Sequence, residues 1–240
     1  MRTAILIPAR DEAEALPHLF EALGAERVRQ VVLVDNGSHD ATADIARAAG
    51  SRVVYEPRAG YGRACLAGIE SLRPAPPDVL VFLDADDFAA AGQFDVLLRP
   101  IEEGEADLVI GEREADAGGG VRWHARLGNR LVLAAMRRLY GADIRDMGPF
   151  RAIRWSTLES LKLDDTNYGW YVQMQVRALR AQTRVRGAPV RFERRTMGRS
   201  KVSGSLPGSI RAGWVMLRTL VVEVARRDPV GAGTVSREQR

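Results

Sequence analysis

The stretch Val79-Leu80-Val81-Phe82-Leu83-Asp84-Ala85-Asp86 decides the fold, because an uninterrupted apolar run ends there on two carboxylates. A run that is apolar on both faces predicts a buried strand in a parallel sheet covered by helices. Hard divalent cations prefer oxygen ligands, so the two carboxylates indicate a site for such a cation beside a phosphate-bearing ligand. The stretch therefore predicts an α/β fold with a ligand site at the end of this strand.

Two earlier apolar runs end in the same way. Val31 to Val34 is followed by Asp35-Asn36-Gly37-Ser38, and Ala4 to Ile7 is followed by Pro8-Ala9-Arg10-Asp11-Glu12. The carboxyl ends of parallel strands meet at one edge of an open α/β sheet, which is where ligands bind. We therefore expect the three strand exits to contribute to one site.

Length and composition restrict the class of protein. The chain has 240 residues, enough for one sizeable α/β domain. The single Cys65 excludes an internal disulfide framework and suits a reducing cytoplasm. The net charge is +4, and almost all of the positive charge is Arg, with only Lys162 and Lys201 as lysines, so composition gives little support to a nucleic-acid partner. We see no signal peptide and no run of the ~18 apolar residues that a spanning helix needs, so we expect a cytoplasmic protein.

The spacing of apolar residues predicts alternating strands and helices in the first half of the chain. Helices are expected over 14–23, 40–49, 61–72 and 93–101, with further strands over 52–55 and 106–110. The second half is less regular, with a glycine loop at 116–120, helices over 121–140 and 168–181, a strand over 149–153 and a strand or hairpin over 185–192. Repeated alternation of strand and helix predicts a doubly wound sheet.

Four motifs occur in an order that resembles one enzyme family. They are Ile7 to Glu12, Val34 to Ser38, Asp84-Ala85-Asp86 and Gly198-Arg199-Ser200-Lys201. In this order they resemble family 2 glycosyltransferases with the GT-A fold, a Rossmann-like, mostly parallel sheet flanked by helices. Within that family the chain is most similar to the branch of dolichyl-phosphate mannosyltransferase and the polyprenyl-phosphate glucosyltransferases. The resemblance covers about residues 1–215.

The resemblance implies a single glycosyltransferase domain over residues 1–227. The nucleotide-sugar half would span about 1–112, the acceptor half about 113–205 and a C-terminal amphipathic helix about 206–227, with a disordered tail over 228–240. That helix could lie at a membrane surface, pack on the domain or contact a dimer partner. Its apolar stripe consists of Ile210, Trp214, Leu217, Val221 and Val224.

The resemblance also implies an activity. We expect metal-dependent, inverting transfer of a hexose from a nucleoside diphosphate sugar, with UDP-glucose favoured over GDP-mannose, to polyprenyl phosphate. The expected location is the cytoplasm or the inner face of the cell membrane, with peripheral membrane contact. A soluble hydroxyl acceptor is the first alternative, and a nucleotide-sugar-binding protein with impaired catalysis is the second. The oligomeric state is left open.

On the donor side, the resemblance gives Asp35 and Glu12 the role of accepting hydrogen bonds from the base and the ribose. Asp84 would bind ribose or metal, and Asp86 would bind the Mg²⁺ or Mn²⁺ that bridges the diphosphate. A basic loop would offset charge on the departing nucleotide, while turn, cap and solvated roles remain the alternatives. The expected donor-binding residues are Pro8, Ala9, Arg10, Glu12, Asp35, Arg63, Asp84, Arg195, Arg199 and Lys201.

On the acceptor side, Arg122, Arg126 and Arg130 recur every four residues and so share one face of the expected long helix. The resemblance implies that they bind an acceptor phosphate, with Trp170 nearby, and a solvated basic face is the alternative. It also implies that Asp146 positions the sugar or acts as a general base. The expected catalytic residues are Asp146, Asp86 and Lys201.

Two departures from the family pattern qualify the resemblance. Gln173 stands where relatives usually carry Glu in a Gly-Trp-x-x-Glu segment, and an amide cannot act as a base. This departure favours a phosphate acceptor, moves the base role to Asp146, or marks an impaired or specialised site. Asp11 replaces an Asn of many relatives but keeps a short polar side chain. The glycine-rich connection from Arg58 to Arg63 matches the family's donor-side segment and could let backbone and guanidinium approach the nucleotide; a lone Gly-x-Gly is weak evidence, and an ordinary loop and helix start is the alternative.

Overall fold

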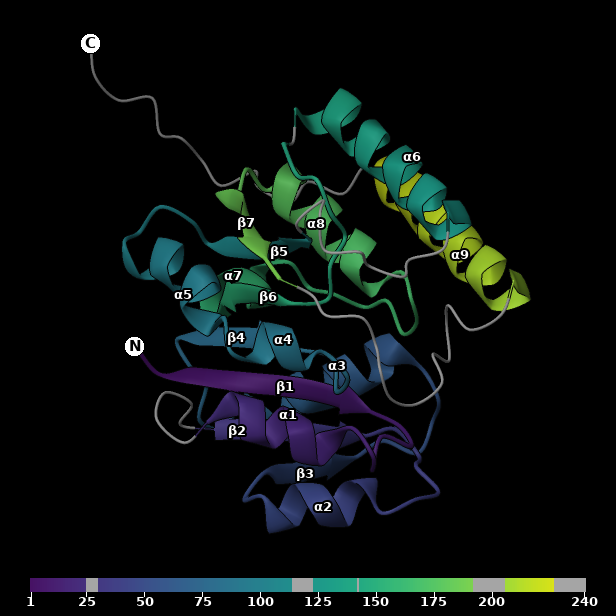
Figure 1. The fold of residues 1–240 in the computed structure, drawn as a ribbon. Coiled ribbons are helices and arrows are strands. Elements are labelled where there is room, and N and C mark those ends of the chain that lie inside the picture. The colour runs from purple at the N-terminus through teal and green to yellow at the C-terminus, as the bar shows by residue number, and fades with distance from the viewer. Residues whose placement is uncertain (25–29, 114–122, 142, 192–205, 227–240) are drawn as a thin grey trace.

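The described residues form one mixed α/β unit around a seven-stranded sheet. The computed structural model describes residues 1–24, 30–113, 123–141, 143–191 and 206–226 (Figure 1). The sheet has the order β3-β2-β1-β4-β6-β5-β7. Its strands are β1 Thr3–Ala9, β2 Gln30–Asp35, β3 Arg52–Tyr55, β4 Val79–Phe82, β5 Leu108–Arg113, β6 Arg151–Arg154 and β7 Val185–Val190.

The sheet is parallel except at one strand. β6 pairs antiparallel with both of its neighbours, β4 and β5, whereas the other paired strands run parallel. The sequence predicted a strand over 149–153 but not its direction, because direction depends on pairing with strands far away in the chain. The expected fold class, a mostly parallel sheet between helices, is confirmed.

Helices cover both faces of the sheet, and two separate apolar clusters lie beneath them. One cluster joins the sheet to α3, α6 and α8, and the other joins it to α1 and α5. Neighbouring residues of β1, such as Ile5 and Leu6, enter opposite clusters, as expected for a strand that is buried on both faces. The helices are α1 Leu16–Leu23, α2 Thr42–Ala48, α3 Tyr61–Leu72, α4 Phe88–Ala91, α5 Phe94–Glu102, α6 Trp123–Tyr140, α7 Trp155–Ser160, α8 Trp170–Arg180 and α9 Leu206–Ala225.

Most of the expected elements are confirmed, some to the residue. The bounds of α3 and β3 match the predictions, and Gly24 and Gly50 follow α1 and α2 with positive φ values of 60° and 79°. The sequence missed the short helices α4 and α7. The predicted glycine loop at 116–120, the basic loop around Lys201 and the tail over 228–240 lie outside the described residues.

The helices α6 and α9 lie side by side along one flank of the molecule, and α9 also packs on α8 (Figure 1). No helix within the described ranges is long and apolar enough to cross a membrane.

Candidate donor and metal site

The ends of β1, β2 and β4 meet at one edge of the sheet. Asp35, the last residue of β2, is level with Ala9, the last residue of β1. Phe82 of β4 is level with Leu6 of β1, and Asp84 follows two residues later. The expectation that the strand exits with their polar side chains share one edge is therefore confirmed.

Asp35 and Asn36 organise the exit of β2. The Ser38 backbone N–H donates to Asp35 Oδ1 at 2.9 Å, so one carboxylate oxygen makes the local turn and the other has no hydrogen-bond partner among the described residues. The Asn36 amide donates to two carbonyls and accepts from a third residue, which fixes the connection from β3 to α3. These partners are Glu56 O at 2.9 Å, Arg58 O at 2.8 Å and Gly60 N at 2.9 Å.

The exit of β1 is tied to the same turn. The Asp11 backbone N–H donates to Ser38 Oγ at 2.9 Å, and the His39 N–H donates to Asp11 Oδ1 at 2.7 Å. Asp11 has a φ of 48°, a left-handed conformation that Asn and Asp tolerate better than most residues. The exchange of Asn for Asp therefore preserves the turn. The Glu12 N–H donates to Thr42 Oγ1 at 2.8 Å, which positions the residue expected to contact ribose.

Two tyrosines orient the first carboxylate after β4. The Tyr61 hydroxyl donates to Asp84 Oδ1 at 2.7 Å and also shares a hydrogen bond with the Tyr171 hydroxyl. The two rings are in tilted contact, with centroids 5.3 Å apart. Burial raises the pKa of both phenols well above the ordinary value, and the nearby Asp84 carboxylate raises it further. Both hydroxyls therefore stay protonated at neutral pH and can donate.

A buried cation lies behind this pair. Arg151 at the start of β6 is fully buried, and its guanidinium carbon lies 4.0 Å from the centroid of the Tyr171 ring. Its Nε donates to Gly148 O at 3.1 Å. Burial lowers the pKa of Arg151 to about 10, and the neighbouring Tyr171, Asp146 and Asp84 limit the fall. Arg151 therefore remains charged at neutral pH and places positive charge beside the carboxylates. The signal in the sequence was an Arg among apolar residues in the strand expected over 149–153.

Arg113, which the sequence did not single out, binds Asp146. Its Nε lies 2.6 Å from Asp146 Oδ2, its Nη2 lies 2.7 Å from Oδ1, and its backbone N–H donates to Oδ2 at 3.2 Å. The Met147 N–H adds a fourth donor at 2.7 Å from Oδ1. The hydrogen bond to Asp146 raises the pKa of Arg113, and the charge of Asp87 raises it further. Four donors hold the Asp146 carboxylate, which favours positioning over general-base action; the base role stays a prediction.

Asp84 and Asp86 fit a divalent metal that binds together with a phosphate ligand. Both are partly buried at the exit of β4, and the described residues contain no group of three or more side chains that could hold a metal by themselves. Mg²⁺ commonly binds one or two carboxylates and completes its shell with water and substrate phosphates. Asp87 occupies the N-cap position of α4 without a side-chain cap hydrogen bond. A metal role for Asp84 and Asp86 remains a prediction that this set of oxygen ligands supports.

The glycines at the start of α3 admit another part of the chain. A Cβ on Gly60 would lie 2.4 Å from Thr166 O, and a Cβ on Gly62 would lie 2.1 Å from Asp165 O. The Arg63 N–H donates to Thr166 O at 3.2 Å. In this structure the backbone of residues 165–166 lies against these glycines. The sequence led us to expect the nucleotide in that position.

Gln173 is a structural residue of α8. Its Oε1 accepts from the backbone N–H groups of Asp164 and Asp165, each at 2.8 Å. Its Nε2 donates to Asp164 Oδ1 and Glu223 Oε1, also at 2.8 Å. Arg177 pairs with the same two acids, at 2.7 Å and 3.0 Å. Both polar atoms of the Gln173 amide are hydrogen-bonded in the joint between α8 and α9, which Gln173, Arg177, Asp164 and Glu223 form. The presence of Gln at this position therefore does not indicate an impaired site.

The remaining expected site residues differ in their placement. Trp170 is fully buried, with its ring centroid 6.2 Å from that of Phe82, so the predicted contact with an acceptor is not supported. Arg10 is exposed near Asp11, and Arg130 is exposed on α6. Pro8 and Ala9 end β1, Arg63 lies in the first turn of α3, Arg126 lies in α6 with its side chain outside the description, and Arg122, Arg195, Arg199 and Lys201 lie outside the described residues.

Comparison with known proteins places these observations in one family. Residues 4–161 match the family described as Glycosyl transferase family 2. An undecaprenyl-phosphate mannosyltransferase of Micrococcus luteus is 34% identical over 224 residues, which cover 87% of this chain and 90% of the relative. A polyprenol monophosphomannose synthase of Mycolicibacterium smegmatis is 33% identical over 222 residues, which cover 85% and 82%.

A solved structure shares the fold. Glucosyl-3-phosphoglycerate synthase of Mycobacterium tuberculosis, in complex with Mn²⁺, UDP-glucose and phosphoglyceric acid, superposes with a TM-score of 0.76. The match covers 95% of this chain and 81% of that protein at 21% identity. This likeness confirms the expected GT-A fold.

Proposed function

Because the chain belongs to glycosyl transferase family 2 and is a glycosyltransferase, we propose that it transfers a hexose from a nucleoside diphosphate sugar to polyprenyl phosphate. The observation that carries the proposal is the shared sheet edge, where Asp35 and the Asp84-Ala85-Asp86 segment follow strands in register with β1. Both relatives described above are named for mannosyl transfer to a polyprenyl or polyprenol phosphate. Their names favour a mannosyl donor over the UDP-glucose favoured by the sequence.

The donor would lie across the exits of β1, β2 and β4. The second oxygen of Asp35 would accept from the base, and Glu12 would accept from the ribose. Asp84 and Asp86 would hold Mg²⁺ or Mn²⁺ with the diphosphate, and Tyr61 fixes the orientation of the first carboxylate. When bound, such a metal neutralises negative charge on the leaving diphosphate.

The acceptor chemistry follows from the surroundings of Asp146. A phosphate monoester carries negative charge at neutral pH, so its oxygen can attack the anomeric carbon without a general base. Attack opposite the departing diphosphate inverts the configuration. The four donors on Asp146 suit this reaction, because the carboxylate is used to hold Arg113 and the backbone at Met147 in place.

The proposal is tested first on the donor side. Thermal shifts with GDP-mannose and UDP-glucose, with and without Mn²⁺, should show stabilisation that requires the metal, because a ligand of the folded state raises apparent stability. Asp86→Ala should remove the metal-dependent part of the shift. Asp44→Ala, at an 82% exposed carboxylate of α2, is the matched control and should respond as the unmodified protein does. An unchanged metal-dependent shift in Asp86→Ala would contradict the metal role.

The acceptor is tested by comparing a prenyl phosphate with the corresponding prenyl alcohol. Hexose transfer to the phosphate alone supports the proposed reaction. Transfer to the alcohol, or to a soluble sugar in place of either lipid, would overturn the assignment of the acceptor and leave the donor half standing.

A further inference from the structure

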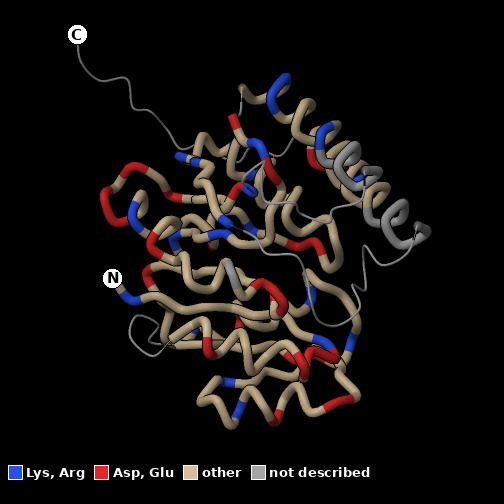
Figure 2. The backbone as a smooth tube through the Cα atoms, in the orientation of Figure 1, with Lys and Arg blue, Asp and Glu red and all other residues tan. Residues whose placement is uncertain are grey.

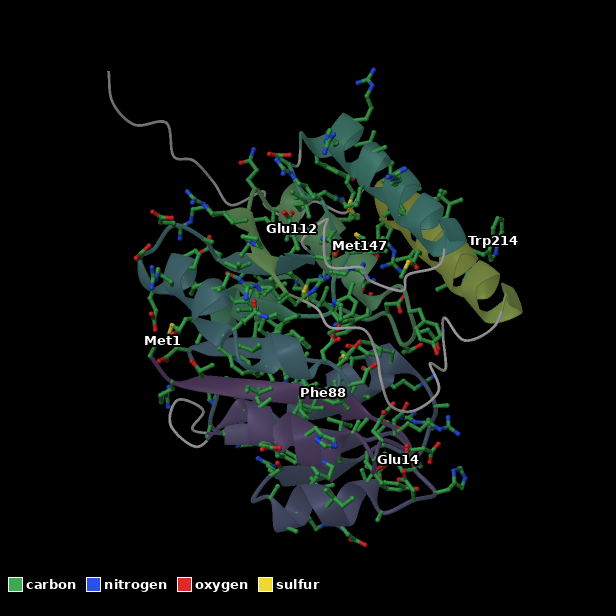
Figure 3. The ribbon with its side chains drawn as sticks, in the orientation of Figure 1. Met1, Glu14, Phe88, Glu112, Met147 and Trp214 are labelled. Carbon is green, nitrogen blue, oxygen red and sulfur yellow. The ribbon has the colours of Figure 1, made fainter. Side chains whose placement is uncertain are left out.

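The outward face of α9 is apolar. Trp214 is 66% exposed and Val221 is 60% exposed, while Leu217 and Val224 are each 40% exposed. Their spacing of three, four and three residues places them on one side of the helix. Figure 3 shows Trp214 on the side of α9 that points away from the rest of the molecule. Four residues of the apolar stripe predicted from the sequence therefore face outward, and the side chain of the fifth, Ile210, lies outside the described part of α9.

The inward face of α9 holds the helix through polar contacts. Leu220 is 4% exposed and Glu223 is 1% exposed, and the Glu223 carboxylate is bound by Arg177 and Gln173 of α8. The Arg180 side chain also donates to Glu223 O at 3.0 Å. A helix on a soluble protein normally buries its apolar face and exposes its charges. α9 buries Leu220 and packs Met216 against the core cluster, but it also buries Glu223 and exposes a second apolar stripe. Contiguous exposed apolar surface of this kind marks an interaction site.

The flank formed by α6 and α9 carries almost no negative charge. The sequence of α6 contains no Asp or Glu, and the one acid of α9 is the buried Glu223, although the chain has 31 acidic residues in total. Exposed cations on the two helices include Arg130, Arg138 and Arg218. Figure 2 shows basic positions along α6.

We propose that the α6 and α9 flank docks this protein peripherally on an anionic lipid surface. Exposed Trp, Leu and Val flanked by Arg is the pattern of a helix that inserts its apolar side between lipid headgroups while its cations attract anionic lipids. A second copy of the chain fits less well, because two such flanks would bring like charges together. The docking itself does not require the proposed function. Only its purpose, which is access to a lipid-borne acceptor phosphate, rests on that function.

Flotation of the full chain with vesicles tests the proposal. The protein should float with vesicles that contain phosphatidylglycerol, bind phosphatidylcholine vesicles more weakly, and dissociate as salt is raised. The double variant Trp214→Ser/Val221→Ser should bind at least about tenfold more weakly, because each lost side chain removes apolar area from the lipid contact. Arg218→Gln should weaken binding about fivefold.

Val96→Ser is the matched control, since Val96 is 36% exposed on α5 at the opposite side of the molecule in Figure 1. It should bind vesicles as the unmodified protein does. The double variant should keep its thermal midpoint, because the altered side chains point outward. Equal flotation of the double variant and Val96→Ser, or failure of the unmodified protein to float with anionic vesicles, would overturn the proposal. So would a dimer that the double variant converts to monomer without any lipid binding.

The same variants separate this proposal from the proposed function. With a short-chain, water-soluble prenyl phosphate, the double variant should transfer hexose at the rate of the unmodified protein. Loss of transfer with the soluble acceptor would show that the flank serves the active site, and would count against a docking role. If the unmodified protein floats normally but transfers to no prenyl phosphate, the proposed acceptor is wrong and the docking surface stands.

Discussion

Replacing Gln173 by Glu should destabilise the protein without improving catalysis. The Gln173 amide nitrogen lies 2.8 Å from a carboxylate oxygen of Asp164 and 2.8 Å from one of Glu223. In the variant a carboxylate oxygen would face those two oxygens, so two hydrogen bonds to charged groups would become two repulsive contacts. A hydrogen bond to a charged group contributes about 1.5–3 kcal/mol, and a buried charge left without a partner costs about 3–5 kcal/mol. Because Arg177 offsets part of the added charge, we expect a loss of about 3–5 kcal/mol.

Urea unfolding at neutral and mildly acidic pH measures this loss. The repulsion should raise the pKa of the new Glu above its value in the unfolded chain. The folded protein then binds a proton more readily than the unfolded one, so the penalty is largest above the folded pKa and shrinks as the pH falls through it. Gln182→Glu makes the same change of charge at an exposed residue after α8 and should alter stability by no more than about 0.5 kcal/mol.

Activity gives the second measurement on Gln173→Glu. If Gln173 stood in place of a catalytic Glu, the variant would transfer hexose faster than the unmodified protein. We expect no gain, since the side chain is 3% exposed and bound within the joint between α8 and α9. A higher transfer rate, or unfolding indistinguishable from that of Gln182→Glu, would refute the structural role.

Three further changes test other contacts. Tyr61→Phe removes the hydroxyl that donates to Asp84, the first carboxylate after β4. Calorimetry should show that Mn²⁺ binds about tenfold more weakly in the presence of a nucleoside diphosphate. The thermal midpoint of the metal-free protein should change little. Gly62→Ala should lower the free energy of unfolding in urea by about 1–3 kcal/mol, because its Cβ would lie 2.1 Å from a backbone oxygen. Gly213→Ala, in open space within α9, should raise it by about 0.5–1 kcal/mol. Equal effects of the two variants would contradict the close approach at Gly62. Burial raises the pKa of Glu223, but the pairing with Arg177 outweighs burial, so the pKa in the folded protein is lower than in the unfolded chain. Glu223 therefore stabilises the fold above its unfolded pKa, and this stabilisation is lost as the pH falls through the folded pKa. Glu223→Gln should therefore lose stability at neutral pH and show a shallower acid dependence below about pH 4.5, and parallel curves would exclude this explanation.

The parts of the fold that depend on local sequence could be predicted. β4 is apolar at every position and all of it is buried, and α3 begins and ends where its sequence pattern predicted. The direction of β6 could not be predicted, because it depends on neighbours such as Val79, which pairs with Arg154. The orientation of α9 could not be predicted either, since it depends on a buried ion pair between Arg177 and Glu223, two residues that are 46 positions apart.

The candidate site divides along the same line. The carboxylates at the strand exits follow directly from their strands, so the sequence alone places Asp35 and Asp84 at one edge of the sheet. Tyr61 and Tyr171 are 110 positions apart, and each taken alone is an ordinary aromatic residue near the start of a helix. Arg113 likewise binds an acid 33 positions away. The contacts that orient the carboxylates join segments that are far apart in the chain. A single sequence does not show which distant segments meet.

α8 links the donor carboxylate to the outward helix. Tyr171 bonds the tyrosine that orients Asp84, and two residues later Gln173 binds Glu223 of α9. In this chain Asp164 and Glu223 both present carboxylates to α8, so the α8 residues that face them, Gln173 and Arg177, donate hydrogen bonds. A Glu at 173 would place a third carboxylate against these two. Gln173 therefore matches the acids of the facing segments, and it holds Glu223 of α9 while Tyr171 on the same helix keeps its contact with the tyrosine that binds Asp84.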